Sequence, residues 1–194
     1  MSLCHVGKKV ICMLSTQQVV CNKSSNSYSI RERLTSLCPK FLSTNFDPDP
    51  FFQAQIIAEA GPIIIGENNM IEERAKIINA KDPNATSETT RVMIIGNSNV
   101  FEVDSTSYAL KIGDFNNLES KSIVGKSTVL TNGCIVGAGC KIVTEETIPE
   151  NCVIYGSKNN RRLQGDRPGP QTLQIEYLSK VLPNYHHLKK PTKK

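Results

Sequence analysis

Histidine is the side chain best suited to general-base catalysis or zinc binding, and it is scarce in this sequence. The chain of 194 residues contains three histidines, His5, His186 and His187. A structural zinc ion takes four protein ligands and a catalytic zinc ion takes three. The adjacent pair near the C-terminus is a poor zinc site on its own, and His5 lies at the other end of the sequence. We therefore predict no catalytic residue, no metal and no cofactor.

Cysteine is the next candidate for metal binding or for covalent cross-linking. The chain has seven cysteines, an odd number, and they form no CxxC pair. Because disulfide frameworks use paired cysteines in oxidising compartments, we expect a reduced protein of the cytoplasm. Cys134 and Cys152 are 18 residues apart, and Cys140 lies between them. Core packing is favoured for these three, with a metal site or a disulfide as the alternative.

A six-residue repeat of aliphatic residues predicts the fold, and the fold determines where the histidine and cysteine side chains would lie. An α-helix repeats every 3.6 residues and a strand every 2, whereas a period of six indicates a hexapeptide β-helix. Three hexads make one triangular coil with the aliphatic residues inside, and coils stack at about 4.8 Å. Hexapeptide prisms as a class coil left-handed. The repeat comprises Ile112, Leu118, Val124, Leu130, Val136, Ile142, Ile148 and Ile154.

The hexad phase also predicts how the chain is divided. The phase begins near Ile56, and we find none before residue 55. The polar stretch 79–92 interrupts it and predicts a surface loop. The expected fold class is all-β, a left-handed parallel β-helix of hexapeptide repeats with a C-terminal α-helix. The predicted segments are a divergent or poorly ordered extension at 1–54, the β-helix at 55–158, a linker at 159–170, a helix at 171–183 and a basic tail at 184–194.

The predicted C-terminal helix has recognisable ends and one apolar face. Thr172 is a plausible N-cap, and Pro183 is expected to end the helix because proline lacks a backbone N–H donor. A lone helix of this length is marginal, so we expect it to lie along a face of the prism. The expected apolar face contains Leu173, Tyr177, Leu178, Val181 and Leu182.

Composition and the histidine positions exclude several classes of function. The net charge of +5 is too mild to indicate nucleic-acid binding, and no apolar run approaches the roughly 20 residues that span a membrane. Hexapeptide prisms host γ-class carbonic anhydrases, which need three zinc histidines, and acyltransferases, which use a histidine base. Residues 56–158 contain no histidine. An enzyme of either kind is therefore the disfavoured alternative.

A second internal repeat aligns two kinds of polar residue. The segments 66–72, 96–102 and 113–119 each begin with glycine, carry an asparagine in the middle and end in glutamate. Asn69, Asn99 and Asn116 would stack at one corner of the prism. A stacked row of like charges costs stability, so Glu72, Glu102 and Glu119 indicate compensation by a partner or by Arg74, Lys76 and Lys121. A row of solvated glutamates is the simpler interpretation.

Four segments resemble one family in particular. These are IIAEAGPIIIGENNMIEE, VMIIGNSNVFEV, KIGDFNNLES and the C-terminal PQTLQIEYLSKVLPNYHHLKK. They resemble the dynactin subunit 6 family, whose left-handed β-helix is similar to γ-class carbonic anhydrases without their zinc histidines. The resemblance covers about residues 55–190, and the segment from Pro170 onwards makes it specific. Family members begin with two further coils, for which we find no counterpart before residue 55.

The resemblance implies a non-catalytic structural subunit of the dynactin pointed-end complex, acting in dynein-based transport along microtubules and in cargo attachment. It implies a heterodimer with dynactin subunit 5, contacts with subunit 4 and the pointed-end actin-related protein, and association with dynein–dynactin cargo adaptors. The expected location is the cytoplasm and the cytoskeleton. A self-associating trimer is a further alternative. The candidate partner-interface residues are Glu72, Glu102, Glu119, Tyr177, Tyr185, His186 and His187.

Overall fold

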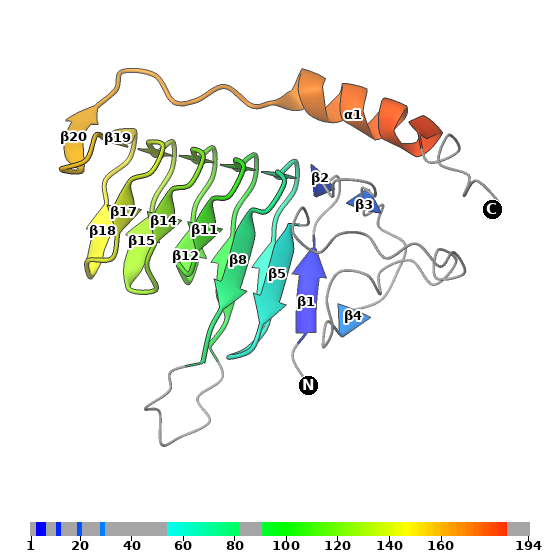
Figure 1. Ribbon diagram of the computed structural model, residues 1–194, viewed down its shortest axis with the longest axis horizontal. Helices are drawn as coiled ribbons and strands as arrows, with labels where there is room; N and C mark the ends of the chain where they lie inside the picture. The colour runs from blue at the N-terminus through cyan, green and yellow to red at the C-terminus, as the bar shows by residue number, and fades with distance from the viewer. Residues whose placement is uncertain are drawn as a thin grey trace, which may run out of the picture.

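The computed structural model describes residues 3–6, 11–12, 19–20, 28–29, 54–81 and 91–185. Three sheets of short strands wind around one interior and form a left-handed parallel β-helix, with a single α-helix after it (Figure 1). Within the β-helix each strand pairs in parallel with strands of the coils before and after it. The predicted fold class is therefore confirmed.

Each of the three sheets forms one face of the prism. The seven-stranded sheet contains β1 (Leu3–Val6), β4 (Tyr28–Ser29), β6 (Ile63–Ile65), β9 (Met93–Ile95), β12 (Lys111–Ile112), β15 (Thr128–Leu130) and β18 (Glu146–Ile148). The eight-stranded sheet contains β2 (Ile11–Cys12), β3 (Val19–Val20), β7 (Met70–Ile71), β10 (Val100–Phe101), β13 (Asn117–Leu118), β16 (Ile135–Val136), β19 (Cys152–Tyr155) and β20 (Asn160–Leu163). The five-stranded sheet contains β5 (Gln55–Ala58), β8 (Lys76–Asn79), β11 (Thr106–Ser107), β14 (Ile123–Val124) and β17 (Lys141–Ile142).

The register of the strands confirms the hexad phase. Ile112 pairs with Leu130, and Leu130 pairs with Ile148, as the spacing of 18 predicts. The same holds for Leu118 with Val136 in the eight-stranded sheet. All eight aliphatic residues of the repeat are 0–2% exposed. Complete burial of each such side chain is worth about 1.5–3 kcal/mol, so this ladder is a large contribution to the core.

Backbone pairing corrects one expectation about the N-terminal residues. Strand β1 pairs in parallel with β6, placing Val6 beside Ile65, and β2 pairs in parallel with β7, placing Cys12 beside Ile71. These pairs place both residues in backbone register with strands of the prism, so coil strands do precede residue 55. The missed signal is the six-residue step from Val6 to Cys12. The six-residue repeat was not recognised there because Cys12 occupies a position that is aliphatic in the other coils.

Two irregular stretches of sequence lie next to each other in the fold. Gly61 lies between Ile56 and Ile65, which are nine residues apart instead of six. It is so close to the backbone of Arg91 that an added Cβ would be 2.3 Å from the Arg91 carbonyl oxygen. The buried Asn79 amide donates to the carbonyls of both Gly61 (3.0 Å) and Arg91 (2.7 Å). Asn79 is part of strand β8, so the predicted loop at 79–92 begins later than expected.

Two corners of the prism use left-handed backbone, which is uncommon outside glycine. The residue before each asparagine of the 69/99/116 row takes this conformation, so the asparagines themselves do not. Phe115, with φ of 58°, is the bulkiest residue to do so, and the next coil has Gly133 at the same place. The two rows comprise Asn68, Ser98, Phe115, Gly133 and Asn151 at one corner and Arg74, Asp104, Lys121 and Gly139 at the other.

The C-terminal helix α1 (Thr172–Tyr185) differs from the prediction at both ends. The Ile175 N–H donates to the Gln171 carbonyl at 2.9 Å, which places Gln171 at the N-cap and Thr172 in the first turn. The helix continues two residues past Pro183, because a proline this near the C-terminus removes only a bond of the final turn. As predicted, the helix lies along the prism (Figure 1).

Candidate interaction surfaces

The asparagine row is a buried hydrogen-bonded ladder that ties successive coils together. The Asn99 N–H donates to Asn69 Oδ1, and the Asn116 N–H donates to Asn99 Oδ1, both at 2.9 Å. The Cys134 N–H continues the row by donating to Asn116 Oδ1 at 2.8 Å. The three asparagines are at most 1% exposed. The predicted corner ladder is therefore present, and it faces the interior rather than a partner.

The glutamate row at the next corner also links the coils. Glu72 accepts the backbone N–H of Val103 at 3.2 Å, and Glu119 accepts that of Ala138 at 2.9 Å. Glu102 accepts both the N–H and the hydroxyl of Ser120 at 3.0 Å. Each carboxylate therefore serves as an acceptor for the coil that follows it. The three side chains are half-buried, so they do not form a freely solvated row.

The stacking of the glutamates carries an electrostatic cost at Glu72. Partial burial raises the pKa of Glu72, and the neighbouring Glu102 carboxylate raises it further. Arg74, a cation expected to offset the row, instead forms an ion pair with Asp104. The observed compensation is the hydrogen bond from the backbone, which lowers the pKa of Glu72 and favours its charged form.

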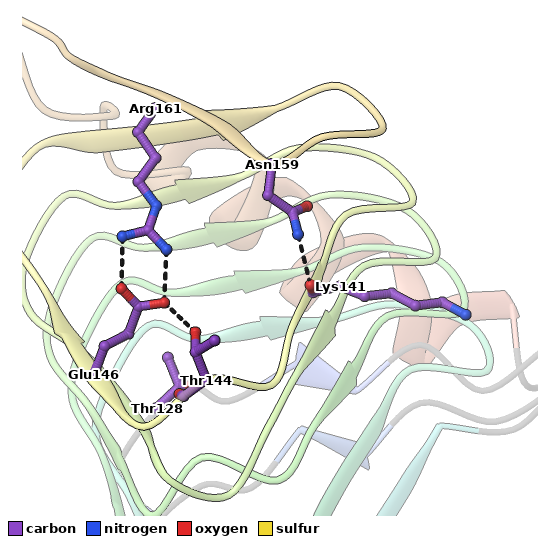
Figure 2. A network of polar contacts seen from close by, with 6 residues as sticks. All are labelled: Thr128, Lys141, Thr144, Glu146, Asn159 and Arg161. Atoms are coloured by element: carbon purple, nitrogen blue, oxygen red, sulfur yellow. Dashed lines mark hydrogen bonds and ion pairs between the residues drawn. The ribbon is translucent and has the colours of Figure 1, made fainter.

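A second polar network closes the C-terminal end of the prism (Figure 2). Strand β20 turns back antiparallel on β19, and the Arg161 guanidinium reaches Glu146 of β18 through contacts of 2.5 and 2.6 Å. The Thr144 hydroxyl donates to the same carboxylate, and the Asn159 amide donates to the Lys141 carbonyl of β17 at 2.8 Å. Contact with Arg161 is the main reason that the pKa of Glu146 is lowered. One hairpin thus reaches all three faces at the last coil.

From this cap the linker returns along the corner of left-handed residues. The Gln164 N–H donates to the Asn151 carbonyl at 2.9 Å, and its side-chain amide donates to the Gly133 carbonyl at 3.0 Å. The Arg167 guanidinium carbon lies 4.0 Å from the centroid of the Phe115 ring. A cation over an aromatic face is worth about 0.5–1 kcal/mol at an exposed site. The linker is therefore anchored to three successive coils.

Part of the apolar face expected of α1 is exposed, whereas Leu178 of that face is half-buried. Leu173 is 84% exposed and Tyr177 is 63% exposed, whereas Ile175 is 2% exposed. Met70 and Val100 point outward from the eight-stranded sheet and are nevertheless 3% and 8% exposed.

The candidate interface residues therefore occupy three different places. The glutamates form a corner row on the prism, whereas Tyr177 projects from α1 into solvent. Tyr185 is the last residue of α1, and His186 and His187 lie outside the described residues. Sequence reasoning missed the exposed aliphatic residues Ile64, Val92 and Ile94. The signal for Ile64 and Ile94 is an isoleucine at an outward strand position.

Chemistry at the cysteines is limited by burial. Cys134, Cys140 and Cys152 are free thiols in the core, at most 3% exposed, as the preference for core packing predicts. Burial raises the pKa of each thiol, which disfavours the reactive thiolate. Among the described residues, no group of three or more potential ligands could hold a metal ion. In that same part of the chain, no helix is long and apolar enough to cross a membrane.

Comparison with known proteins identifies close relatives. The chain is 60% identical over 145 residues to dynactin subunit 6 of Danio rerio, covering 73% of this chain and 74% of that protein. It is 56% identical over 144 residues to dynactin subunit 6 of Nematostella vectensis, covering 73% and 78%. A hexapeptide transferase family protein from Anaplasma phagocytophilum is 17% identical with a TM-score of 0.47, covering 70% of this chain and 72% of that one. No family model matches the chain.

Proposed function

This chain belongs to the dynactin subunit 6 family, and from that membership we propose that it is a non-catalytic structural subunit of dynactin. In this proposal it forms part of the pointed-end complex and supports dynein-based transport along microtubules and cargo attachment. Its location is the cytoplasm, on the cytoskeleton. The identity of 56–60% to the relatives is the observation that carries the proposal.

The interior of the prism supports a scaffold rather than an enzyme. Catalysis on a hexapeptide prism by the two expected routes needs histidine, and residues 56–158 contain none. Rows that could hold reactive side chains instead carry Asn69, Asn99 and Asn116, whose polar groups bond to adjacent coils. Such ladders fix the position of one coil on the next, which is what a rigid adaptor requires.

The proposed partners follow from the same family membership. They are dynactin subunit 5 as the other half of a heterodimer, dynactin subunit 4, the pointed-end actin-related protein, and dynein–dynactin cargo adaptors. The helix α1 is a natural contact because Leu173 and Tyr177 are one turn apart and exposed. Glu72, Glu102 and Glu119 remain candidates, but each also supports the fold, so a variant at these positions tests two roles at once.

Co-expression with subunit 5 tests the proposal directly. We expect a one-to-one complex on size-exclusion chromatography with light scattering, and assembly with subunit 4 and the actin-related protein when these are added. The chain purified alone should contain no stoichiometric zinc and should not accelerate CO2 hydration. Bound zinc together with activity would refute the scaffold and favour the enzyme. A stable homotrimer that excludes subunit 5 would favour self-association instead.

A further inference from the structure

We propose that the Asn132–Gly133 peptide is a site of spontaneous deamidation, restrained by the hydrogen bonds of its corner. The reaction converts Asn132 to aspartate or isoaspartate and consumes only water. The product carries a carboxylate between Asp114 and Glu150, which lie in the coils before and after it. The site lies on the corner along which the linker runs, and its chemistry is independent of the proposed function.

The sequence singles out this peptide among the asparagines. Asn132 is the one asparagine of the chain that is followed by glycine. Deamidation begins when the backbone nitrogen of the following residue attacks the side-chain carbonyl carbon of asparagine, and glycine has no side chain to hinder that approach. The Asn132 side chain is exposed, so water reaches it. Residue type and exposure therefore both favour the reaction at this position.

The covalent steps consume water, release ammonia and involve no oxidation or reduction. The Gly133 nitrogen gives up its proton and forms a bond to Cγ of Asn132, and the side-chain amide nitrogen takes up that proton and leaves as ammonia. Water then opens the resulting cyclic imide at one of its two carbonyl carbons. Opening at the backbone carbonyl gives isoaspartate, whose chain continues through the side-chain carbon, and opening at the side-chain carbonyl gives aspartate.

Hydrogen bonds on both reacting groups restrain the attack. The Gly133 N–H donates to the Asp114 carbonyl at 2.9 Å, so the attacking nitrogen must first leave that bond. The Asn132 side chain is held at both ends, because Oδ1 accepts the Asp114 N–H at 2.8 Å and Nδ2 donates to Glu150 Oε1 at 3.0 Å. From the linker, the Gln164 side-chain amide donates to the Gly133 carbonyl at 3.0 Å. Release of the linker should therefore accelerate the reaction.

Asn97 provides an internal comparison, because it has equivalent contacts without the glycine. Its Oδ1 accepts the Glu67 N–H at 2.8 Å, as that of Asn132 accepts the Asp114 N–H. The Ser98 N–H donates to the Glu67 carbonyl at 2.9 Å, in the way that the Gly133 N–H donates to Asp114. Asn97 is exposed as well. A difference in deamidation rate between the two sites therefore reports the residue that follows the asparagine.

The product disturbs the row of side chains at this corner. The neutral Asn132 amide separates the carboxylates of Asp114 and Glu150 and donates to the second of them. Aspartate at this position loses that donor and places like charges in adjacent coils, which is destabilising. Isoaspartate also lengthens the backbone next to Gly133, where an added Cβ would already be 2.3 Å from Asn151 Oδ1. Deamidation should therefore loosen the corner and the linker that runs over it.

The first measurement follows deamidation in the folded full chain during incubation at mildly alkaline pH. Peptide mapping by mass spectrometry gives the rate at each asparagine and separates aspartate from isoaspartate. We expect Asn132 to convert about tenfold faster than Asn97, because glycine lets the reacting atoms approach more closely. Gln164→Ala should accelerate conversion of Asn132 by about threefold, since one restraining hydrogen bond is lost. Asp166→Ala, at an exposed position of the same linker, should leave the rate unchanged.

A second measurement tests the effect of the product through Asn132→Asp. The matched control is Asn132→Ala, which also removes the amide but adds no charge. We expect Asn132→Asp to melt at a lower temperature than Asn132→Ala near neutral pH. The difference should disappear at high salt, where charges are screened, and at low pH, where carboxylates are protonated.

The rates and melting temperatures can each contradict the inference. If Asn132 converts no faster than Asn97 in the parent chain, the peptide is not a deamidation site of the kind proposed. If Gln164→Ala converts at the parent rate, the linker does not restrain the reaction. If Asn132→Asp and Asn132→Ala melt at the same temperature, the added carboxylate does not disturb the row. All three outcomes leave the proposed function as it stands, because none involves a partner.

Discussion

Replacement of Asn116 tests whether the buried ladder supports the stack of coils. Its Oδ1 accepts the Cys134 N–H at 2.8 Å, and its Nδ2 donates to the Thr131 carbonyl at 2.9 Å. Asn116→Ala leaves the buried Cys134 N–H and the part-buried Thr131 carbonyl without this partner. Each such loss costs about 1–3 kcal/mol, so we expect a decrease of about 4 kcal/mol in the free energy of unfolding. For a chain of this size that lowers Tm by about 8–16 °C.

The matched control is Asn132→Ala, an exposed residue at the same corner in the next coil. Its Oδ1 also accepts a backbone N–H, that of Asp114 at 2.8 Å, but the site is exposed and water can replace the amide. We expect less than about 1 kcal/mol of destabilisation. Thermal melting by circular dichroism and urea titration measure both variants. Equal losses for Asn116→Ala and Asn132→Ala would refute the argument, because burial would then not be the cause.

Asn116→Asp sharpens the same test. The carboxylate keeps an acceptor for Cys134, but it cannot donate to Thr131 and carries a buried charge. Protonation restores a donor, so this variant should gain stability relative to the parent chain as the pH falls. A variant whose relative stability is the same at low and neutral pH would show that the carboxyl group does not remain in the ladder.

Three further predictions concern the corners and the cap. Glu72→Gln should be neutral or stabilising near pH 7 in urea titrations, because a folded-state pKa raised above the unfolded value makes the charged form a cost that disappears as pH falls. Arg161→Leu should remove stability above the unfolded pKa of Glu146 but not at pH values below its lowered folded pKa, a difference visible in melting curves across pH and expected to be less than about 1 kcal/mol. Phe115→Asn should relieve left-handed strain yet release Arg167, so limited proteolysis should cut the linker faster while the Tm of the prism is unchanged or higher.

Strict periodicity explains which parts of the fold were accessible from sequence. The interior rows from Ile112 to Ile154 follow from spacing alone, since only one register buries every aliphatic residue. The asparagine ladder follows from a repeat of residue type at the same spacing. The pairing of β1 with β6 and of β2 with β7 was missed because Cys12 stands where an aliphatic residue would have revealed the six-residue repeat. A six-residue period can be recognised in a sequence only where the sixth positions keep their aliphatic residues.

The C-terminal helix shows a different limit. Its sequence contains two apolar stripes, one with Leu173 and Tyr177 and one with Ile175, and both have helical spacing. Which stripe packs depends on the path of the linker. That path is set by the contacts of Gln164 with Gly133 and of Arg167 with Phe115, on coils distant in sequence. Contacts of this kind join residues that no local pattern connects. The exposure of Ile64 could not be predicted for a similar reason, since a run of three isoleucines does not show what covers the middle one.

The contacts at the C-terminal end of the prism should make the coils at the opposite end unfold first. Each coil contacts only its neighbours, so the stack behaves as a one-dimensional array that frays from its termini. The contacts of Asn159 and Arg161 hold the last coil, and the linker ties that coil to the two before it. Backbone amides of β12 to β16 should therefore exchange hydrogen most slowly, and protection should decline towards β5. A chain built this way can loosen at one end while the other keeps its shape.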